Sequence, residues 1–213
     1  MQANGDAVFF TKQNSSFVLY APTAITAASF SALPVTAFGL NGTAVDGTAG
    51  GTDNGTLSGS ATTGTGLLGT TTSLVGTLTD SSNNMVSFNA SGSPSLWAQA
   101  SSLATVAGSY TASFSVSGVN YTPSLKIDSS GNISGTDTTT TTCTYGGSVT
   151  TPDTTHNDYN VSLTASCLTG TFTGIGAFFP AGLSNPNGVL STAEFKVGLT
   201  NGSTTGIYLN LIQ

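Results

Sequence analysis

The two cysteines of this chain, Cys143 and Cys167, restrict its fold more than any other feature of the sequence. If they face each other across an antiparallel hairpin, their register sorts the flanking residues onto two faces. On one face every residue is apolar or glycine, and the predicted pairs are Tyr145 with Ala165, Gly147 with Leu163, and Val149 with Val161. On the other face every residue is polar or glycine. Because side chains alternate along a strand, a shift by one residue would place Ser and Thr against the core.

The same register brings the two sulfur atoms together. Directly opposed residues of an antiparallel pair lie about 4.5–5.5 Å apart at Cα, within the ~4.4–6.8 Å that a disulfide bond accepts. We therefore predict a Cys143–Cys167 disulfide bond across the open end of the hairpin. Such a bond indicates an oxidising compartment. We therefore expect the periplasm, the cell surface or the outside of the cell; the competing interpretation is two buried free thiols in a cytosolic protein.

Charge excludes one class of partner. Charged residues are only 6% of the 213 residues, and three lysines stand against nine acidic residues. A chain with so few cations cannot neutralise a row of phosphates, so we expect no nucleic-acid partner. No apolar run approaches the ~20 residues of a membrane-spanning helix, so we expect no transmembrane segment in this chain. The first ten residues lack the basic start and long apolar centre of a signal peptide, so an export signal or lipid anchor would have to lie upstream of this sequence.

The stapled hairpin has an earlier counterpart, because three segments recur in the same order. Residues 54–63 resemble 130–139, residues 73–79 resemble 144–150, and residues 84–91 resemble 159–166. In the earlier copy the same kind of register opposes Leu78 to Val86 and Gly76 to Phe88. We predict two tandem, related antiparallel β domains, residues 1–92 and residues 108–213, with the disulfide bond only in the second.

Residues 93–107 are predicted to form a short helical linker between the two domains. Ser93 is a suitable N-cap, and Pro94 suits the first helical position. The apolar residues with helical spacing are Leu96, Ala100 and Leu103.

The fold class is therefore predicted to be all-β. The second domain reads as about eight short antiparallel strands with tight turns, which favours a small barrel or a sandwich over an open sheet. Its last hairpin is predicted to turn at Asn201–Gly202. The predicted pairing sets Phe195, Val197 and Leu199 against Ile207, Leu209 and Leu211.

The histidine at the tip of the stapled hairpin is the main candidate for chemistry. His156 lies between Asp153 and Asp158, and one imidazole with two carboxylates could bind a metal ion weakly. The competing interpretation is a solvated hairpin tip. A Ser–His–Asp triad would require His156 to be packed in a cleft beside a nucleophile. We expect no catalytic residues, no enzyme activity and no cofactor.

Two further acidic patterns are weaker candidates for calcium binding. Asp128, Ser130 and Asn132 alternate as in a calcium loop, but no terminal Glu follows, so a plain turn is expected. Asp46 and Asp53 bracket a glycine-rich loop that could bind calcium weakly. Aromatic residues could also line a ligand cavity inside a barrel, although ordinary core is the expected role. These residues are Phe9, Phe10, Phe17, Tyr20, Phe178 and Phe179.

The segments "SLATVAGSYTASFSV", "LKIDSSGNISGTD", "CTYGGSVTT", "NDYNVSLTASC" and "GTFTGIGAFF" occur in this order across residues 103–213. In order and spacing they resemble exported lipoproteins of Burkholderia-type Gram-negative proteobacteria, a largely uncharacterised family. The first domain resembles the family only loosely. The resemblance implies an exported, lipid-anchored protein at the outer membrane or cell surface, with the periplasm or secretion as alternatives. Such a protein could serve as a surface antigen, and the resemblance transfers no catalytic residues. The lipobox cysteine of such proteins is absent here; without one, a secreted protein remains.

Three classes of function compete, and the third is a hydrolase or metal-dependent enzyme, in which His156→Ala should abolish activity or metal uptake. The first is a non-enzymatic exported surface or periplasmic β protein that acts by binding or adhesion, with an unknown protein or a host surface component as partner. The alternative is a lipocalin-like carrier of a small apolar ligand. A nearly uncharged polar exterior without a catalytic set favours the first function.

Overall fold

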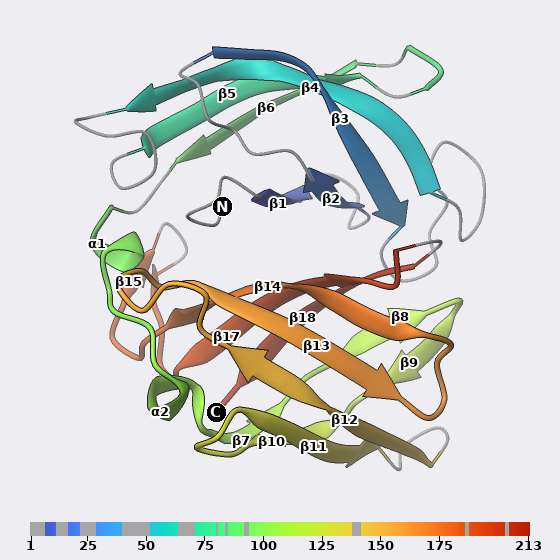
Figure 1. The fold of residues 1–213 in the computed structure, drawn as a ribbon, viewed down its shortest axis with the longest axis vertical. Helices are drawn as coiled ribbons and strands as arrows, with labels where there is room; N and C mark the ends of the chain where they lie inside the picture. The colour runs from blue at the N-terminus through green and yellow to red at the C-terminus, as the bar shows by residue number, and fades with distance from the viewer. Residues whose placement is uncertain are drawn as a thin grey trace.

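The computed structural model describes residues 7–11, 17–21, 29–39, 52–63, 71–79, 81–83, 85–91, 94–137, 142–185, 188–202 and 205–213. Within these ranges the chain is almost entirely β-structure, with two short helices, which confirms the predicted fold class (Figure 1). Two assemblies dominate: a closed antiparallel barrel and a six-stranded antiparallel sheet.

The barrel decides between the two architectures that the sequence left open. Eight antiparallel strands close on themselves, so the second half of the chain is a barrel and not a sandwich. In order around the barrel they are β7 (Gly108–Thr111), β10 (Ser124–Ile127), β11 (Asn132–Asp137), β12 (Cys143–Thr150), β13 (Tyr159–Ala165), β14 (Thr171–Phe179), β17 (Glu194–Thr200) and β18 (Gly206–Ile212). Each barrel strand pairs with the barrel strand that follows it along the chain, and the last one, β18, pairs with the first, β7. Two hairpins interrupt this path: β8 (Phe114–Val116) with β9 (Val119–Tyr121), and β15 (Ser184–Asn185) with β16 (Gly188–Val189).

Alternation along the strands explains the barrel core. In β13 the residues Tyr159, Val161, Leu163 and Ala165 are buried, and the residues between them are exposed or half-buried. The predicted register of β12 with β13 is confirmed, including the pairs Gly147 with Leu163 and Val149 with Val161. The last hairpin also has its predicted pairs, but its connection is longer than a two-residue turn, since β17 ends at Thr200 and β18 begins at Gly206.

Most of the buried apolar side chains form one cluster, drawn from residues 106–211, while Val35 and Leu57 are buried in the six-stranded sheet. Large rings occupy its centre: Tyr159 and Phe195 meet edge to face with centroids 5.3 Å apart. Such pairs add to the stabilisation that burial of apolar surface provides. The described residues of the barrel therefore carry their own hydrophobic core.

The two ends of the barrel are built differently. One end, which we call the helix end, carries the turn at residues 128–131, the loop at residues 151–158 and the chain segment that enters β7. The other, the disulfide end, carries the β8–β9 hairpin and the Cys143–Cys167 bond. Figure 1 shows the helices at one side of the barrel and β8 and β9 at the opposite side.

The six-stranded sheet has the simple order β1 to β6. Its strands are β1 (Ala7–Thr11), β2 (Phe17–Ala21), β3 (Ser29–Gly39), β4 (Thr52–Thr63), β5 (Thr71–Thr79) and β6 (Met85–Ser91). The predicted pairs Leu78 with Val86 and Gly76 with Phe88 are confirmed. In Figure 1, β1 and β2 lie between the rest of the sheet and the barrel, and β2 approaches β18.

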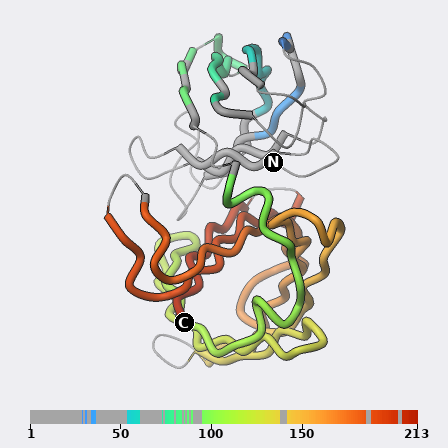
Figure 2. Tube along the Cα trace, turned by 90° about the vertical axis from the view of Figure 1, so that its left-hand side faces the viewer, coloured from blue at the N-terminus to red at the C-terminus, as the bar shows by residue number. Residues whose placement is uncertain are grey.

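The linker differs from the single helix that the sequence predicted. It contains two one-turn helices, α1 (Pro94–Trp97) and α2 (Leu103–Val106), visible as the green segment that enters the barrel in Figure 2. Ser102 separates them because it adopts an extended backbone and caps α2, its hydroxyl accepting a 3.1 Å hydrogen bond from the Thr105 N–H. Ser93, the predicted N-cap of the linker, lies outside the described residues. Within the described ranges, neither helix is long and apolar enough to cross a membrane.

Candidate functional site

The predicted disulfide bond joins Cys143 to Cys167, with the two Cα atoms 5.4 Å apart. It lies two residues beyond the last strand pair of β12 with β13, Tyr145 with Ala165. Ser166 continues the ladder there: its N–H donates to the Thr144 carbonyl at 2.9 Å, and its hydroxyl accepts from the Thr144 N–H at 3.0 Å. The bond is therefore a structural clamp on a regular hairpin.

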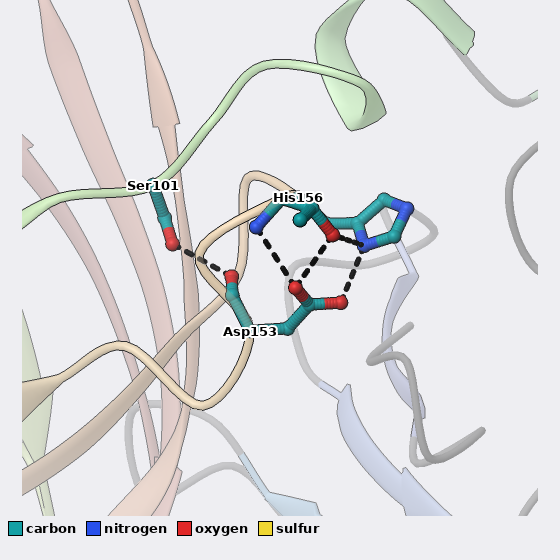
Figure 3. A network of polar contacts seen from close by, with 4 residues as sticks. Ser101, Asp153 and His156 are labelled. Atoms are coloured by element: carbon teal, nitrogen blue, oxygen red, sulfur yellow. Dashed lines mark hydrogen bonds and ion pairs between the residues drawn. The ribbon is translucent and has the colours of Figure 1, made fainter.

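The loop at residues 151–158 contains the sequence's main candidate for chemistry, and Asp153 organises it (Figure 3). The Asp153 carboxylate accepts hydrogen bonds from the Thr155 hydroxyl at 2.6 Å and from the Thr155 N–H at 2.8 Å. It also contacts His156 Nδ1 at 2.5 Å. The hydrogen bonds from Thr155, followed by the contact with His156, lower the pKa of Asp153 from 3.8 to about 2. The carboxylate is therefore ionised at any pH near neutrality.

Four residues from the linker and this loop, Trp97, Ser101, Asp153 and His156, form what we call the linker clasp. The Trp97 and His156 rings stack with centroids 4.6 Å apart. The Ser101 hydroxyl donates to the Asp153 carbonyl at 2.8 Å. The Asn157 N–H donates to the Trp97 carbonyl at 3.0 Å. These contacts hold the linker against the helix end of the barrel.

The clasp resembles a catalytic triad in composition but not in geometry. A triad needs the serine hydroxyl at the imidazole nitrogen that faces away from the carboxylate. Figure 3 shows Ser101 on the other side of Asp153 from the His156 ring, and its hydroxyl is bonded to a backbone carbonyl. Ser101, His156 and Asp153 are thus not arranged for nucleophilic catalysis.

The predicted metal ligands Asp153, His156 and Asp158 belong to the same loop, but they lie in different environments. Asp153 and His156 are partly exposed and in contact, whereas Asp158 is buried, with 3% of its surface exposed. Among the residues that the structure describes, no three His, Cys, Asp or Glu side chains are grouped so that they could hold a metal ion. Weak metal binding by this loop stays a prediction.

The other acidic pattern is a hydrogen-bonded turn. Asp128 accepts hydrogen bonds from the Ser130 N–H at 2.8 Å and from the Asn132 N–H and side-chain amide at 2.9 Å each. The bonds from Asn132 are the main reason that the pKa of Asp128 is lowered. The expected plain turn is confirmed. Asp46 lies outside the described residues, and Asp53 lies in β4 opposite Ala37.

Aromatic side chains fill the barrel at its disulfide end. Phe114 from the β8–β9 hairpin stacks on Tyr121 at 5.2 Å and meets Tyr145 of β12 edge to face at 6.5 Å. All three are buried. Burial of the Tyr145 hydroxyl, and secondarily the charge of Asp137, raises its pKa. The hairpin thus closes this end with its own side chains.

The aromatic residues singled out in the sequence have mixed outcomes. Phe178 packs against the barrel core. Phe179 lies under Lys196, whose Nζ is 4.6 Å from the ring centroid and 3.0 Å from Glu194. The side chains of Phe9, Phe10, Phe17 and Tyr20 lie outside the described part of the structure.

One surface feature was not predicted. An open groove of about 560 Å³ lies over β7, β10 and β11 beside the chain end, where β18 meets β7 through a single residue pair, Ile212 with Thr111. Ser109, Ser124, Lys126 and Ser134 contribute polar groups to it. Gln213 lies at one side and donates to the Tyr110 hydroxyl at 3.1 Å. Sequence patterns could not reveal the groove, because it exists only where the barrel closes.

No protein-family model, no curated protein and no solved structure matches this chain.

Proposed function

We propose that the protein is a non-enzymatic exported binding protein whose barrel is a closed scaffold and whose outer surface carries recognition. One observation carries this proposal: the barrel interior is packed with the chain's own side chains, including Tyr110, Tyr159, Phe172 and Phe195, all almost completely buried. A carrier needs interior volume for its cargo, and eight-stranded barrels are just wide enough either to be filled or to hold one small ligand. This barrel supports the filled alternative.

The outer face of the stapled hairpin suggests the kind of recognition. Its exposed side chains include Thr144, Ser148, Thr150, Asn160, Thr164 and Ser166. Such a surface binds through hydroxyl and amide hydrogen bonds and not through ion pairs. Binding to it should therefore change little with ionic strength, unlike binding between charged surfaces.

An extracytoplasmic location is the second part of the proposal. The Cys143–Cys167 bond supports an oxidising compartment, and the resemblance to exported lipoproteins supports a lipid anchor and a cell-surface position. Antibody labelling of intact cells, compared with permeabilised cells, tests this directly. Labelling only after permeabilisation would contradict a surface position.

The binding function is tested against the carrier function with two sets of probes. Immobilised collagen, laminin and fibronectin serve as surface probes, and a fluorescent fatty acid serves as the apolar probe. We expect saturable binding to a surface probe, and this binding should not change with salt concentration. The Thr144→Lys variant should bind that probe more weakly. The fatty acid should show no saturable binding. Saturable fatty-acid binding with displacement by unlabelled fatty acid would instead establish the carrier.

A further inference from the structure

Strand β6 is an edge of the six-stranded sheet. Its only hydrogen-bonded neighbour among the described strands is β5, and the sheet order ends with it. The sheet is not closed as the barrel is. An edge strand presents a row of backbone N–H and C=O groups to any strand that can pair with it.

The internal repeat indicates what such an edge pairs with. The β5–β6 hairpin repeats the β12–β13 hairpin, and the two have equivalent registers: Gly76 opposes Phe88 as Gly147 opposes Leu163. Likewise Leu78 opposes Val86 as Val149 opposes Val161. The agreement is local, since the pairing of β4 with β5 is shifted by two residues relative to that of β11 with β12.

In the barrel, the equivalent edge of β13 is occupied by β14. The pairing is antiparallel and sets Phe172 opposite Leu163 and Gly174 opposite Val161. Strand β14 has no charged residue, and Phe or Gly stands at every second position from Phe172 to Phe178. After β6 the chain instead enters the linker and α1, so the described part of the sheet has no counterpart of β14.

Strand β6 also lacks the features that usually prevent strand addition. Natural edge strands are blocked by Lys or other charges, by Pro, or by brevity. Met85–Ser91 contains no charged residue and no proline across seven residues. Met85 is 73% exposed, and Ser87 and Asn89 are exposed as well.

We propose that the free edge of β6 binds an extended segment of a partner polypeptide as an added antiparallel strand. The segment has the chemistry of β14: it is uncharged and carries an aromatic residue or glycine at every second position. The main chain supplies affinity through the ladder of hydrogen bonds, and the alternate side chains supply selectivity. The inference goes beyond the proposed function, because it adds a second recognition surface at the edge of the sheet and names the kind of partner that this surface takes.

A synthetic peptide with the β14 sequence TFTGIGAFF, carrying a hydrophilic fluorescent tag, is the probe, and the full chain is the receptor. Fluorescence anisotropy should show saturable binding, and a scrambled peptide should not bind. Hydrogen exchange of residues 85–91 should slow when the peptide is present. Only one set of alternate N–H groups of the peptide faces β6. N-methylation of that set should abolish binding, and N-methylation of the other set should leave binding unchanged.

Two variants on the same sheet make the test specific. Asn89→Lys places a charge on strand β6, and Ser60→Lys places the same charge on β4, which pairs with β3 on one side and β5 on the other; both positions are exposed. Asn89→Lys should weaken peptide binding at least about tenfold and Ser60→Lys should leave it unchanged, with both proteins retaining their melting temperatures.

Four results would overturn the proposal, and the first three are no saturable binding of the peptide, equal binding of the scrambled peptide, and equal effects of the two lysine variants. A dimer in sedimentation that Asn89→Lys dissociates would assign the edge to a second copy of the chain and also overturn it. None of these outcomes changes the labelling of intact cells or the binding to surface probes, so failure here is distinguishable from failure of the proposed function.

Discussion

Neighbouring glycines on β12 show how single residues fix the path of a strand. A Cβ atom on Gly147 would collide with the carbonyl oxygen of Ser162 on β13, a backbone atom that cannot move aside. A Cβ atom on Gly146 would meet only the Thr164 hydroxyl, at an ordinary contact distance of 3.6 Å. The absence of a side chain at Gly147 therefore permits the close approach of β12 to β13.

Gly147→Ala should lower the free energy of unfolding by about 1–3 kcal/mol, the usual effect of overpacking. Gly146→Ala is the matched control and should have little effect. Urea denaturation followed by tyrosine and tryptophan fluorescence measures both. Equal destabilisation by the two substitutions would show that the close approach is not what selects glycine at position 147.

The lowered pKa of Asp153 predicts how the stability of the protein depends on pH. Its folded-state pKa is lowered to about 2, first by hydrogen bonds from Thr155 and then by His156. A group with a lowered folded-state pKa contributes stability above its ordinary value near 3.8 and loses that contribution as the pH falls through its folded-state value. Asp153→Asn should therefore lower the melting temperature between pH 5 and 7, and the difference from the wild type should shrink as the pH approaches about 2. A difference that is constant with pH would contradict the assignment.

At the scale of elements, the stapled hairpin is the most strongly constrained unit. Its disulfide bond joins residues 24 positions apart. Loop-closure entropy in the unfolded chain predicts a stabilisation of roughly 3 kcal/mol for a loop of this size. A Cys143→Ser/Cys167→Ser variant should lose about that free energy of unfolding in urea. A reducing agent should destabilise the wild type and leave the double variant unchanged; an equal response of both would mean that the bond is not the cause.

At the scale of the whole molecule, the barrel and the six-stranded sheet differ in how they are stabilised. The buried apolar cluster is drawn from residues 106–211 and takes in no described residue of the sheet. The linker is held on the barrel by the clasp and by the capping of α2. A fragment of residues 94–213 should therefore fold alone, with its disulfide bond formed.

Cooperative thermal unfolding and dispersed amide NMR signals from this fragment would confirm the predicted division of the chain. A fragment that is compact but lacks cooperative unfolding would show that β2, which approaches β18, is part of the barrel's support. The full chain unfolded under the same conditions is the reference.

The sequence by itself determined the local pairings and their faces. The registers of β12 with β13, β17 with β18, and β5 with β6 agree with period-two alternation, because a shift by one residue would place polar residues against the core. Pairing Cys143 with Cys167 sets the first of these registers, and the clean separation of its two faces supports the bond. The Asp128 turn was also predictable, since its hydrogen bonds join residues within four positions.

Only the tertiary structure decided how these units combine. A barrel and a sandwich require the same alternation, so the choice depended on whether β18 could reach β7, which it does through one residue pair. The linker is interrupted at Ser102, and at the end of α1 and just beyond it Trp97 and Ser101 bind a loop more than fifty residues away; helical spacing contains no information about that loop. Alternation in the sequence indicates which side of a strand is buried, so the buried faces were predictable. Closure of the barrel and docking of the linker depend on contacts between segments that are distant in sequence, so they were not predictable.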